Sequence, residues 1–222
     1  MMPGNRSGNS FADGEVLSFP LVGARHYVRA VDVIALIEQR IPDFRTVQAR
    51  FLRPLSGGAV INLGRRAGAA VSVRVVGDTG DTFEFALANR YPAETLRIDE
   101  APLHPHWVVP SGSGPCRCAI VGRPSAAAVL AVAFAAFQRR VGRRFVLRSL
   151  QLDGLVGHGA ELVTVIGDPP DSGQGARCTI TRNGRSWCRV DMVAAPAADR
   201  VQAAVRNPST SSAWSRVISE GG

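Results

Sequence analysis

The sequence predicts an α+β fold made of two tandem copies of one unit, in which a central helix is wrapped by an antiparallel sheet. Three observations predict it. Each half of the chain reads as a short strand, then a helix, then four further strands. Turn signals join the last two strands of each half, and the second helix is apolar around its whole circumference.

The first unit is predicted to occupy residues 14–91, with its helix at residues 28–40. Its strands are predicted at residues 15–22, 44–55, 59–66, 69–76 and 82–90. Asp78-Thr-Gly-Asp81 joins the last two of these strands, because Gly and Asp are residues that tight turns favour.

The second unit is predicted to occupy residues 117–196, with its helix at residues 125–140. Its strands are predicted at residues 117–121, 144–152, 161–166, 176–181 and 186–194. Asn183-Gly184 joins the last two, and Asn-Gly is the strongest short hairpin signal because both turn positions adopt positive φ.

The second helix favours an architecture in which a sheet covers it. Its segment from Ala126 to Phe137 contains only Ala, Val, Leu and Phe, and Ser125 is available as its N-cap. The helix is too short to span a bilayer, so we expect the antiparallel sheet of its own half to enclose it. Val129, Val132, Ala133 and Phe137 should then be almost fully buried.

The remaining segments are too polar or too rich in glycine and proline to pack regularly. Residues 1–13 are predicted to be a disordered tail and residues 197–222 a loose C-terminal tail. Residues 92–116 contain five prolines and Ser111-Gly-Ser-Gly114, which predicts a linker between the two units. No run of 18 apolar residues and no signal segment is present, so we expect a cytoplasmic protein without a membrane partner.

The net charge of +8 comes from arginine alone, because the sequence contains no lysine. The arginines are scattered along the chain and do not form the basic stripe with aromatic residues that a nucleic-acid groove needs. Solvated surfaces and the docking of an acidic partner both remain open as explanations of this charge.

Sequence motifs for cofactors and metals are missing, and we expect neither. Cys116, Cys118, Cys178 and Cys188 do not have zinc-ligand spacing and are expected to be reduced structural thiols. Phosphate-loop and dinucleotide fingerprints are absent, and Ser111-Gly-Ser-Gly114 lacks the strand and helix that flank a serine nucleophile.

The repeat plan resembles the hotdog superfamily, in particular its double-hotdog members. Phe19-Pro-Leu-Val-Gly-Ala-Arg-His26 precedes the first helix where hydroxyacyl carrier-protein dehydratases have a histidine-bearing loop. Asp32, Glu38 and Gln39-Arg40 are similar to the helix of A-factor biosynthesis hotdog proteins. Gly122-Arg123-Pro124 resembles the segment that precedes the helix in dehydratases. The resemblance implies an acyl thioester substrate carried on coenzyme A or on an acidic acyl carrier protein, and it allows a dimer or a partner hotdog protein.

His26, Glu38 and Asp32 are the catalytic candidates. Dehydration of a β-hydroxyacyl thioester needs a base for the α-proton and an acid for the leaving hydroxyl. Asp32 and Glu38 are six residues apart and cannot share one helical face. Glu38 falls on the apolar stripe with Val31, Ile34 and Ala35, so it is the better internal carboxylate, although an ion pair with an arginine of the next strand remains open.

The thioester carbonyl is expected to bind at the start of the second helix. Backbone amides near Ser125 and Ala126 would polarise it, with Arg123 and His158 nearby as further binding candidates. His158 lies between two glycines, where a backbone or a ligand approaches closely, and simple solvation of this turn remains open.

These features predict an enzyme that acts on a carrier-bound acyl or β-ketoacyl thioester in specialised metabolism, by a dehydratase-like or acyl-transfer step. The second helix contains no Asp or Glu, so the usual pair of catalytic residues from opposite repeats is incomplete. This absence favours the alternative, a catalytically silent hotdog protein that binds an acyl carrier protein or pairs with an active enzyme.

Overall fold

The computed structural model describes residues 11–64, 68–91, 96–99, 116–120, 125–141, 145–153, 161–167, 175–182 and 184–194. The first half contains strands β1 (Val16–Ser18), β3 (Phe44–Phe51), β4 (Gly58–Leu63), β5 (Val71–Gly77) and β6 (Thr82–Asn89) and helix α1 (Ala30–Arg40). The second half contains strands β8 (Cys116–Ile120), β9 (Phe145–Asp153), β10 (Glu161–Gly167), β11 (Gly175–Arg182) and β12 (Arg185–Ala194) and helix α2 (Ala126–Val141). Strands β2 (Leu21–Val22) and β7 (Arg97–Ile98) form a separate parallel pair.

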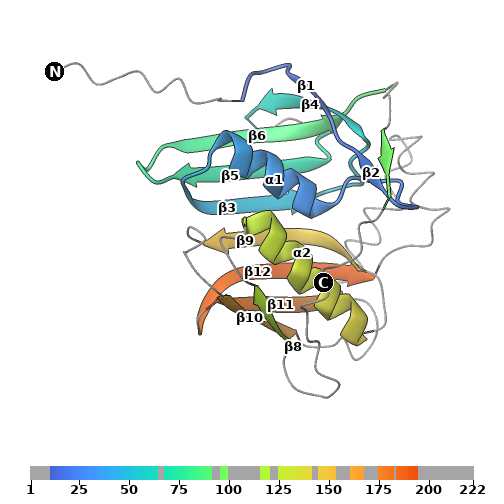
Figure 1. Ribbon diagram of the computed structural model, residues 1–222. Coiled ribbons are helices and arrows are strands. Elements are labelled where there is room, and N and C mark those ends of the chain that lie inside the picture. The colour runs from blue at the N-terminus through green and yellow to red at the C-terminus, as the bar shows by residue number, and fades with distance from the viewer. Residues whose placement is uncertain are drawn as a thin grey trace.

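One antiparallel sheet of ten strands forms the body of the molecule, and both helices lie on the same face of it (Figure 1). The strand order is β1-β4-β6-β5-β3-β9-β12-β11-β10-β8. The predicted α+β class and the predicted packing of helices on an antiparallel sheet are therefore confirmed. The predicted strand at residues 15–22 is divided, because β1 pairs with β4 of the large sheet and β2 pairs with β7.

Strands β3 and β9 join the two halves at the centre of the sheet. Gln48 lies opposite Gln151 in their antiparallel register. The segments around these glutamines are alike, with Arg-Thr-Val-Gln-Ala at 45–49 and Arg-Ser-Leu-Gln-Leu at 148–152. Two similar segments, one from each half, therefore pair with each other across the junction.

The halves differ in the order of their inner strands. In the first half β6 lies between β4 and β5, whereas in the second half β11 lies between β10 and β12. The last two strands of each half still pair as predicted, and Gly80 and Gly184 adopt positive φ in the two turns, at 93° and 76°. Counted outward from the centre of the sheet, β5 takes the place that β12 takes in the other half, and β6 the place of β11. The last two strands of the two halves therefore do not superpose in chain order.

The hydrophobic core lies between the helices and the sheet. Val129, Val132, Ala133 and Phe137 of α2 are 0–5% exposed, which confirms the predicted burial of this helix. The covered face of α1 carries Val31, Val33, Ile34 and Ile37. The expectation that Ala35 belongs to this face is wrong, because the helix turns its side chain to solvent.

Two predicted boundaries need correction. Residues 11–13 were assigned to the disordered tail, but Phe11 is 7% exposed and its ring lies 4.1 Å from that of Phe85, centroid to centroid. Burial of the apolar Phe11 ring against Phe85 stabilises the ordered segment and outweighs the conformational entropy that residues 11–13 would keep as a disordered tail. Within the predicted linker, Arg97–Ile98 forms β7 and Cys116 begins β8. Residues 1–10, 92–95, 100–115 and 195–222, which hold the rest of the predicted tails and linker, lie outside the described residues.

Candidate functional site

Glu38 in the last turn of α1 binds the start of α2, in the other half of the chain. Its Oε1 accepts a hydrogen bond from Ala126 N at 2.5 Å, and its Oε2 accepts one from Ala127 N at 3.0 Å. The side chain is half-buried. Both amides belong to the first turn of α2, where a carboxylate satisfies unpaired N–H groups and interacts favourably with the positive end of the helix dipole.

Ser125 completes this helix start, as its sequence position predicted. Its Oγ accepts a hydrogen bond from Ala128 N at 3.1 Å, and its carbonyl accepts one from Val129 N at 3.0 Å. The structure therefore brings together three of the predicted residues, Glu38, Ser125 and Ala126. Ala127 was missed, and only the N-cap assignment of Ser125 signals that its amide is available.

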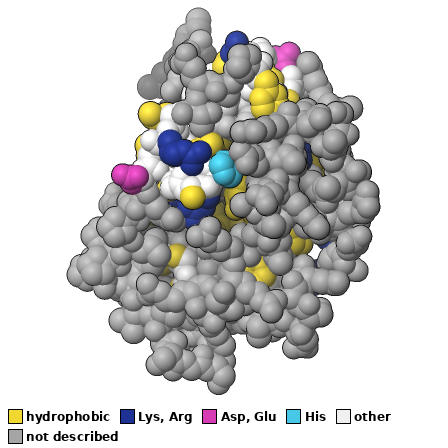
Figure 2. All heavy atoms as spheres, turned by 90° about the vertical axis from the view of Figure 1, so that its right-hand side faces the viewer, with side chains coloured by type: hydrophobic (Ala, Val, Ile, Leu, Met, Phe, Trp, Pro, Cys, Tyr) yellow, Lys and Arg dark blue, Asp and Glu magenta, His cyan; other side chains and the backbone are white. Residues whose placement is uncertain are grey.

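His26 lies in the loop between β2 and α1, and it is half-buried. Arg97 of β7 holds this loop, because its Nη1 donates to the carbonyl oxygens of Gly23 at 2.5 Å and Arg25 at 3.2 Å. His26 is the only histidine among the described residues, and Figure 2 shows a histidine beside arginine side chains at the surface. The loop is therefore a cationic patch, which suits an anionic ligand.

His26 and Glu38 lie at opposite ends of α1 in the chain. His26 precedes the helix, which begins at Ala30, and Glu38 lies in its last turn. With a rise of 1.5 Å per residue, the eight steps from Ala30 to Glu38 span about 12 Å along the helix axis. That both side chains reach one substrate stays a prediction.

Asp32 has a local partner in Arg29. Its Oδ2 accepts hydrogen bonds from the backbone N of Arg29 at 3.2 Å and from its Nε at 2.9 Å, and its Oδ1 pairs with Nη2 at 2.6 Å. These contacts close the N-terminal turn of α1. Asp32 therefore serves the helix start, and the predicted binding residues Arg123 and His158 lie outside the described residues.

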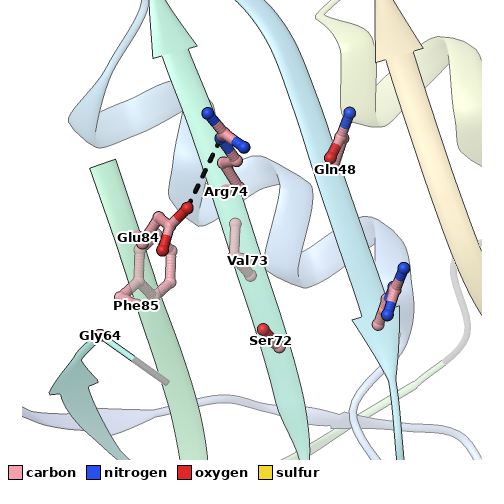
Figure 3. Close-up of a pocket in the computed structure, with 8 residues that line it drawn as sticks. Gln48, Gly64, Ser72, Val73, Arg74, Glu84 and Phe85 are labelled. Atoms are coloured by element: carbon pink, nitrogen blue, oxygen red, sulfur yellow. Dashed lines mark ion pairs between the residues drawn. The ribbon is translucent and has the colours of Figure 1, made fainter. Parts of the chain in front are cut away.

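A polar hollow lies on the face of the sheet opposite the helices. Figure 3 shows Gln48, Ser72, Arg74 and Glu84 along strands β3, β5 and β6, with the helix behind the sheet. Arg74 Nε and Glu84 Oε1 are 3.5 Å apart, and both side chains are about half exposed. The hollow is open and lined by the charged side chains of Arg50, Arg74 and Glu84, so it does not offer an apolar enclosure for an acyl chain.

Two buried cysteines of the second half form no disulfide bond. Cys178 and Cys188 are each 1% exposed. Burial, and to a smaller extent the neighbouring Cys178 and Asp153, raises the pKa of the Cys188 thiol well above its usual range. Among the described residues, no three His, Cys, Asp or Glu side chains form a group that would hold a metal ion. Neither described helix is long and apolar enough to cross a membrane.

We expect Cys188 to resist alkylation in the folded protein. The thiolate is the reactive form, and the raised pKa keeps this thiol protonated at pH 8. Peptide mapping after N-ethylmaleimide treatment should find Cys188 unmodified in native protein and fully modified in guanidinium chloride. Modification at equal rates in both conditions would show that the strand opens readily and would contradict the observed packing.

No protein-family model matches the sequence, and no curated protein matches it either. The solved structures to which the chain is similar have low sequence identity to it. An acyl-ACP thioesterase from Bacteroides thetaiotaomicron is 8% identical, with a TM-score of 0.42, over 82% of this chain and 96% of that one. A bifunctional dehydratase-cyclase domain of ambruticin biosynthesis is 11% identical, with a TM-score of 0.46, over 82% and 86%.

The dehydratase domain of a curacin polyketide synthase module is 12% identical, with a TM-score of 0.40, over 73% of this chain and 79% of that one. At such identities and with TM-scores below 0.5, none of these similarities assigns an activity to the chain. The chain's own architecture, in which two helices lie on one face of a ten-stranded antiparallel sheet, has the α+β arrangement that the resemblance found in the sequence implies.

Proposed function

We propose that the chain is a double hotdog protein that acts on an acyl or β-ketoacyl thioester carried on an acyl carrier protein or coenzyme A. The observation that carries the proposal is the contact of Glu38 with Ala126 N and Ala127 N. It places a carboxylate from one half beside the N-terminal amides of the helix in the other half. A carboxylate can act as a general acid or base. The backbone amides at the start of a helix can donate hydrogen bonds to a carbonyl oxygen on which negative charge develops.

In the proposed step, the thioester carbonyl replaces the Glu38 carboxylate on the amides of Ala126 and Ala127. The freed carboxylate then removes the α-proton while the amides stabilise the enolate oxygen. For a β-hydroxyacyl substrate, the electron pair of the broken C–H bond forms the new double bond and the β-hydroxyl leaves as water after protonation. Glu38, having taken the α-proton, supplies the proton for that hydroxyl.

His26 has a different place in this proposal. It precedes α1, whereas Glu38 lies in the last turn of that helix, and we assign it to carrier binding and not to the proton transfer. The cationic loop that carries it supports an anionic carrier as the partner, since the chain has a net charge of +8 and acyl carrier proteins are acidic. The proposed setting is specialised metabolism in the cytoplasm, with no cofactor.

The alternative function is that of a catalytically silent protein that binds a carrier or pairs with an active hotdog enzyme. A specific observation favours it. Each of the first three amides of α2 already has a partner, Glu38 for Ala126 and Ala127 and Ser125 for Ala128. A helix start capped in this way is stable without any substrate.

The test is incubation of the purified protein with β-hydroxyacyl and β-ketoacyl carrier proteins, followed by intact-protein mass spectrometry. General acid-base participation contributes about 10²- to 10⁴-fold to a rate, so Glu38→Gln should lower turnover by that factor. His26→Ala should leave the chemical step unchanged and weaken carrier binding. Full turnover in Glu38→Gln would remove this residue from the mechanism. Carrier binding without turnover in the wild type would establish the silent protein.

A further inference from the structure

Trp187 occupies an irregular position in β12. Cys188 pairs with Ile180 of β11, but the next pair along the ladder is Ser186 with Thr181. Trp187 is thus the extra residue of a β-bulge, a feature that turns a side chain away from the regular alternation of a strand. Its side chain is 4% exposed and belongs to the hydrophobic core between sheet and helices.

The indole N–H of Trp187 has no acceptor. Among the described residues, Nε1 of Trp187 is the one buried side-chain nitrogen or oxygen without a hydrogen-bond partner. Buried polar groups are almost always paired, and an indole in a core usually finds a partner for its N–H. A phenylalanine would fill an apolar core without this cost, so the unpaired donor indicates an acceptor atom that binds from outside the chain.

The register places Trp187 at the same end of the sheet as the Glu38 contact. Trp187 adjoins Cys188, which pairs with Leu152 near the end of β9. Asp153 at that end pairs with Thr46, near the start of β3, and β3 follows directly after the helix that ends with Glu38 and Arg40. In Figure 1 the start of β12, the end of β9, the end of α1 and the start of α2 all lie on the left-hand side.

We propose that the Trp187 N–H donates a hydrogen bond to the β-oxygen of the bound acyl group, and so selects β-oxo and β-hydroxyacyl chains over saturated ones. This inference rests on the proposed function and names the substrate class of the same site. The indole N–H is only a donor, and the β-oxygen of either chain is an acceptor. A site with a buried donor discriminates against an analogue that lacks the matching oxygen, because the donor is then left unpaired.

The experiment compares two pantetheine ligands of equal chain length, a β-oxoacyl and a saturated acyl chain, each linked by an amide in place of the thioester so that no reaction occurs. One neutral hydrogen bond changes a dissociation constant by about 2- to 12-fold. Calorimetry should show that the wild type binds the β-oxo ligand more tightly by a factor in that range. Trp187→Phe should bind both ligands equally, while Met192→Leu, a change of similar volume at the other end of β12, should keep the preference.

Two further measurements separate a ligand contact from a structural role. The NMR signal of the Trp187 indole N–H, assigned from its loss in Trp187→Phe, should move on addition of the β-oxo ligand and stay in place with the saturated one. The thermal stability of ligand-free Trp187→Phe should fall only by the cost of the cavity that the smaller ring leaves in the core, because no hydrogen bond within the protein is lost.

The possible outcomes are distinguishable. Binding of both ligands with equal affinity by the wild type, or a preference retained in Trp187→Phe, would overturn the role of Trp187 and leave the proposed function standing. An indole N–H signal that stays in place on addition of the β-oxo ligand would show that this N–H does not contact the acyl group, and would also overturn it. Binding of neither ligand would contradict the proposed function itself.

Discussion

The Ala133→Asp variant should not fold. Ala133 lies on the covered side of α2 and is 0% exposed. A carboxylate at this position would be buried without a partner, which costs several kcal/mol even after local relaxation. The free energy of unfolding of a domain is only about 5–15 kcal/mol. We therefore expect insoluble protein, or a soluble chain that lacks a cooperative thermal transition in circular dichroism.

Ala128→Asp is the matched control for this variant. Ala128 is on the same helix, but its side chain is exposed. The attraction of a first-turn carboxylate to the helix dipole and its repulsion by the nearby Glu38 each amount to less than about 1 kcal/mol. Ala128→Asp should accordingly unfold close to the wild-type temperature. If Ala133→Asp also unfolds cooperatively near that temperature, the covering of α2 by the sheet is wrong.

The helices and the strands of the large sheet could be predicted from local signals. A helix made of Ala, Val, Leu and Phe, as most of α2 is, has to be covered to be stable in water. The four side chains of α2 that were predicted to be buried are buried. The hairpins β5-β6 and β11-β12 are encoded by turns in which Gly80 and Gly184 adopt positive φ. Both kinds of signal act within a few neighbouring residues, so a single sequence is enough to reveal them.

The pairing of distant strands could not be predicted in this way. Nothing local distinguishes the order β4-β6-β5 from the order β10-β11-β12, because each half has the same alternation of strands and turns. The similar segments around Gln48 and Gln151 are a signal that sequence reasoning overlooked, and they mark the strands that meet at the centre. Phe11 was missed because a single aromatic residue in a polar segment gives no periodicity.

The site was predicted only in part for the same reason. The position of Glu38 on the apolar stripe of α1 could be predicted from helical spacing, and so could the N-cap role of Ser125. The contact of Glu38 with the backbone N of Ala126 joins residues 88 positions apart in the chain. A single sequence does not show that two positions so far apart in the chain are in contact in space. An ion pair of Glu38 with an arginine of the next strand was an open alternative, whereas the structure gives Glu38 backbone amides of the other half.

Glu38→Ala should destabilise the whole protein and not only its first half. Two hydrogen bonds from the amides of Ala126 and Ala127 end on this carboxylate. A hydrogen bond to a charged group contributes about 1.5–3 kcal/mol, and loss of a helix cap typically costs about 1 kcal/mol. Since the two bonds share one carboxylate and the amides regain water in its absence, we expect a loss of about 2–3 kcal/mol in urea unfolding.

Glu38→Gln and Glu84→Ala complete this test. The glutamine keeps one acceptor oxygen near the helix start but loses the charge, so its stability should fall between those of the wild type and Glu38→Ala. Glu84 pairs with Arg74 on the exposed face at 3.5 Å, and such surface pairs contribute at most about 1 kcal/mol. Because the Glu38 contact joins the halves, its removal should lower the transition midpoints of probes in both halves equally. If Glu38→Ala costs no more than Glu84→Ala, the carboxylate does not stabilise α2 and the prediction is wrong.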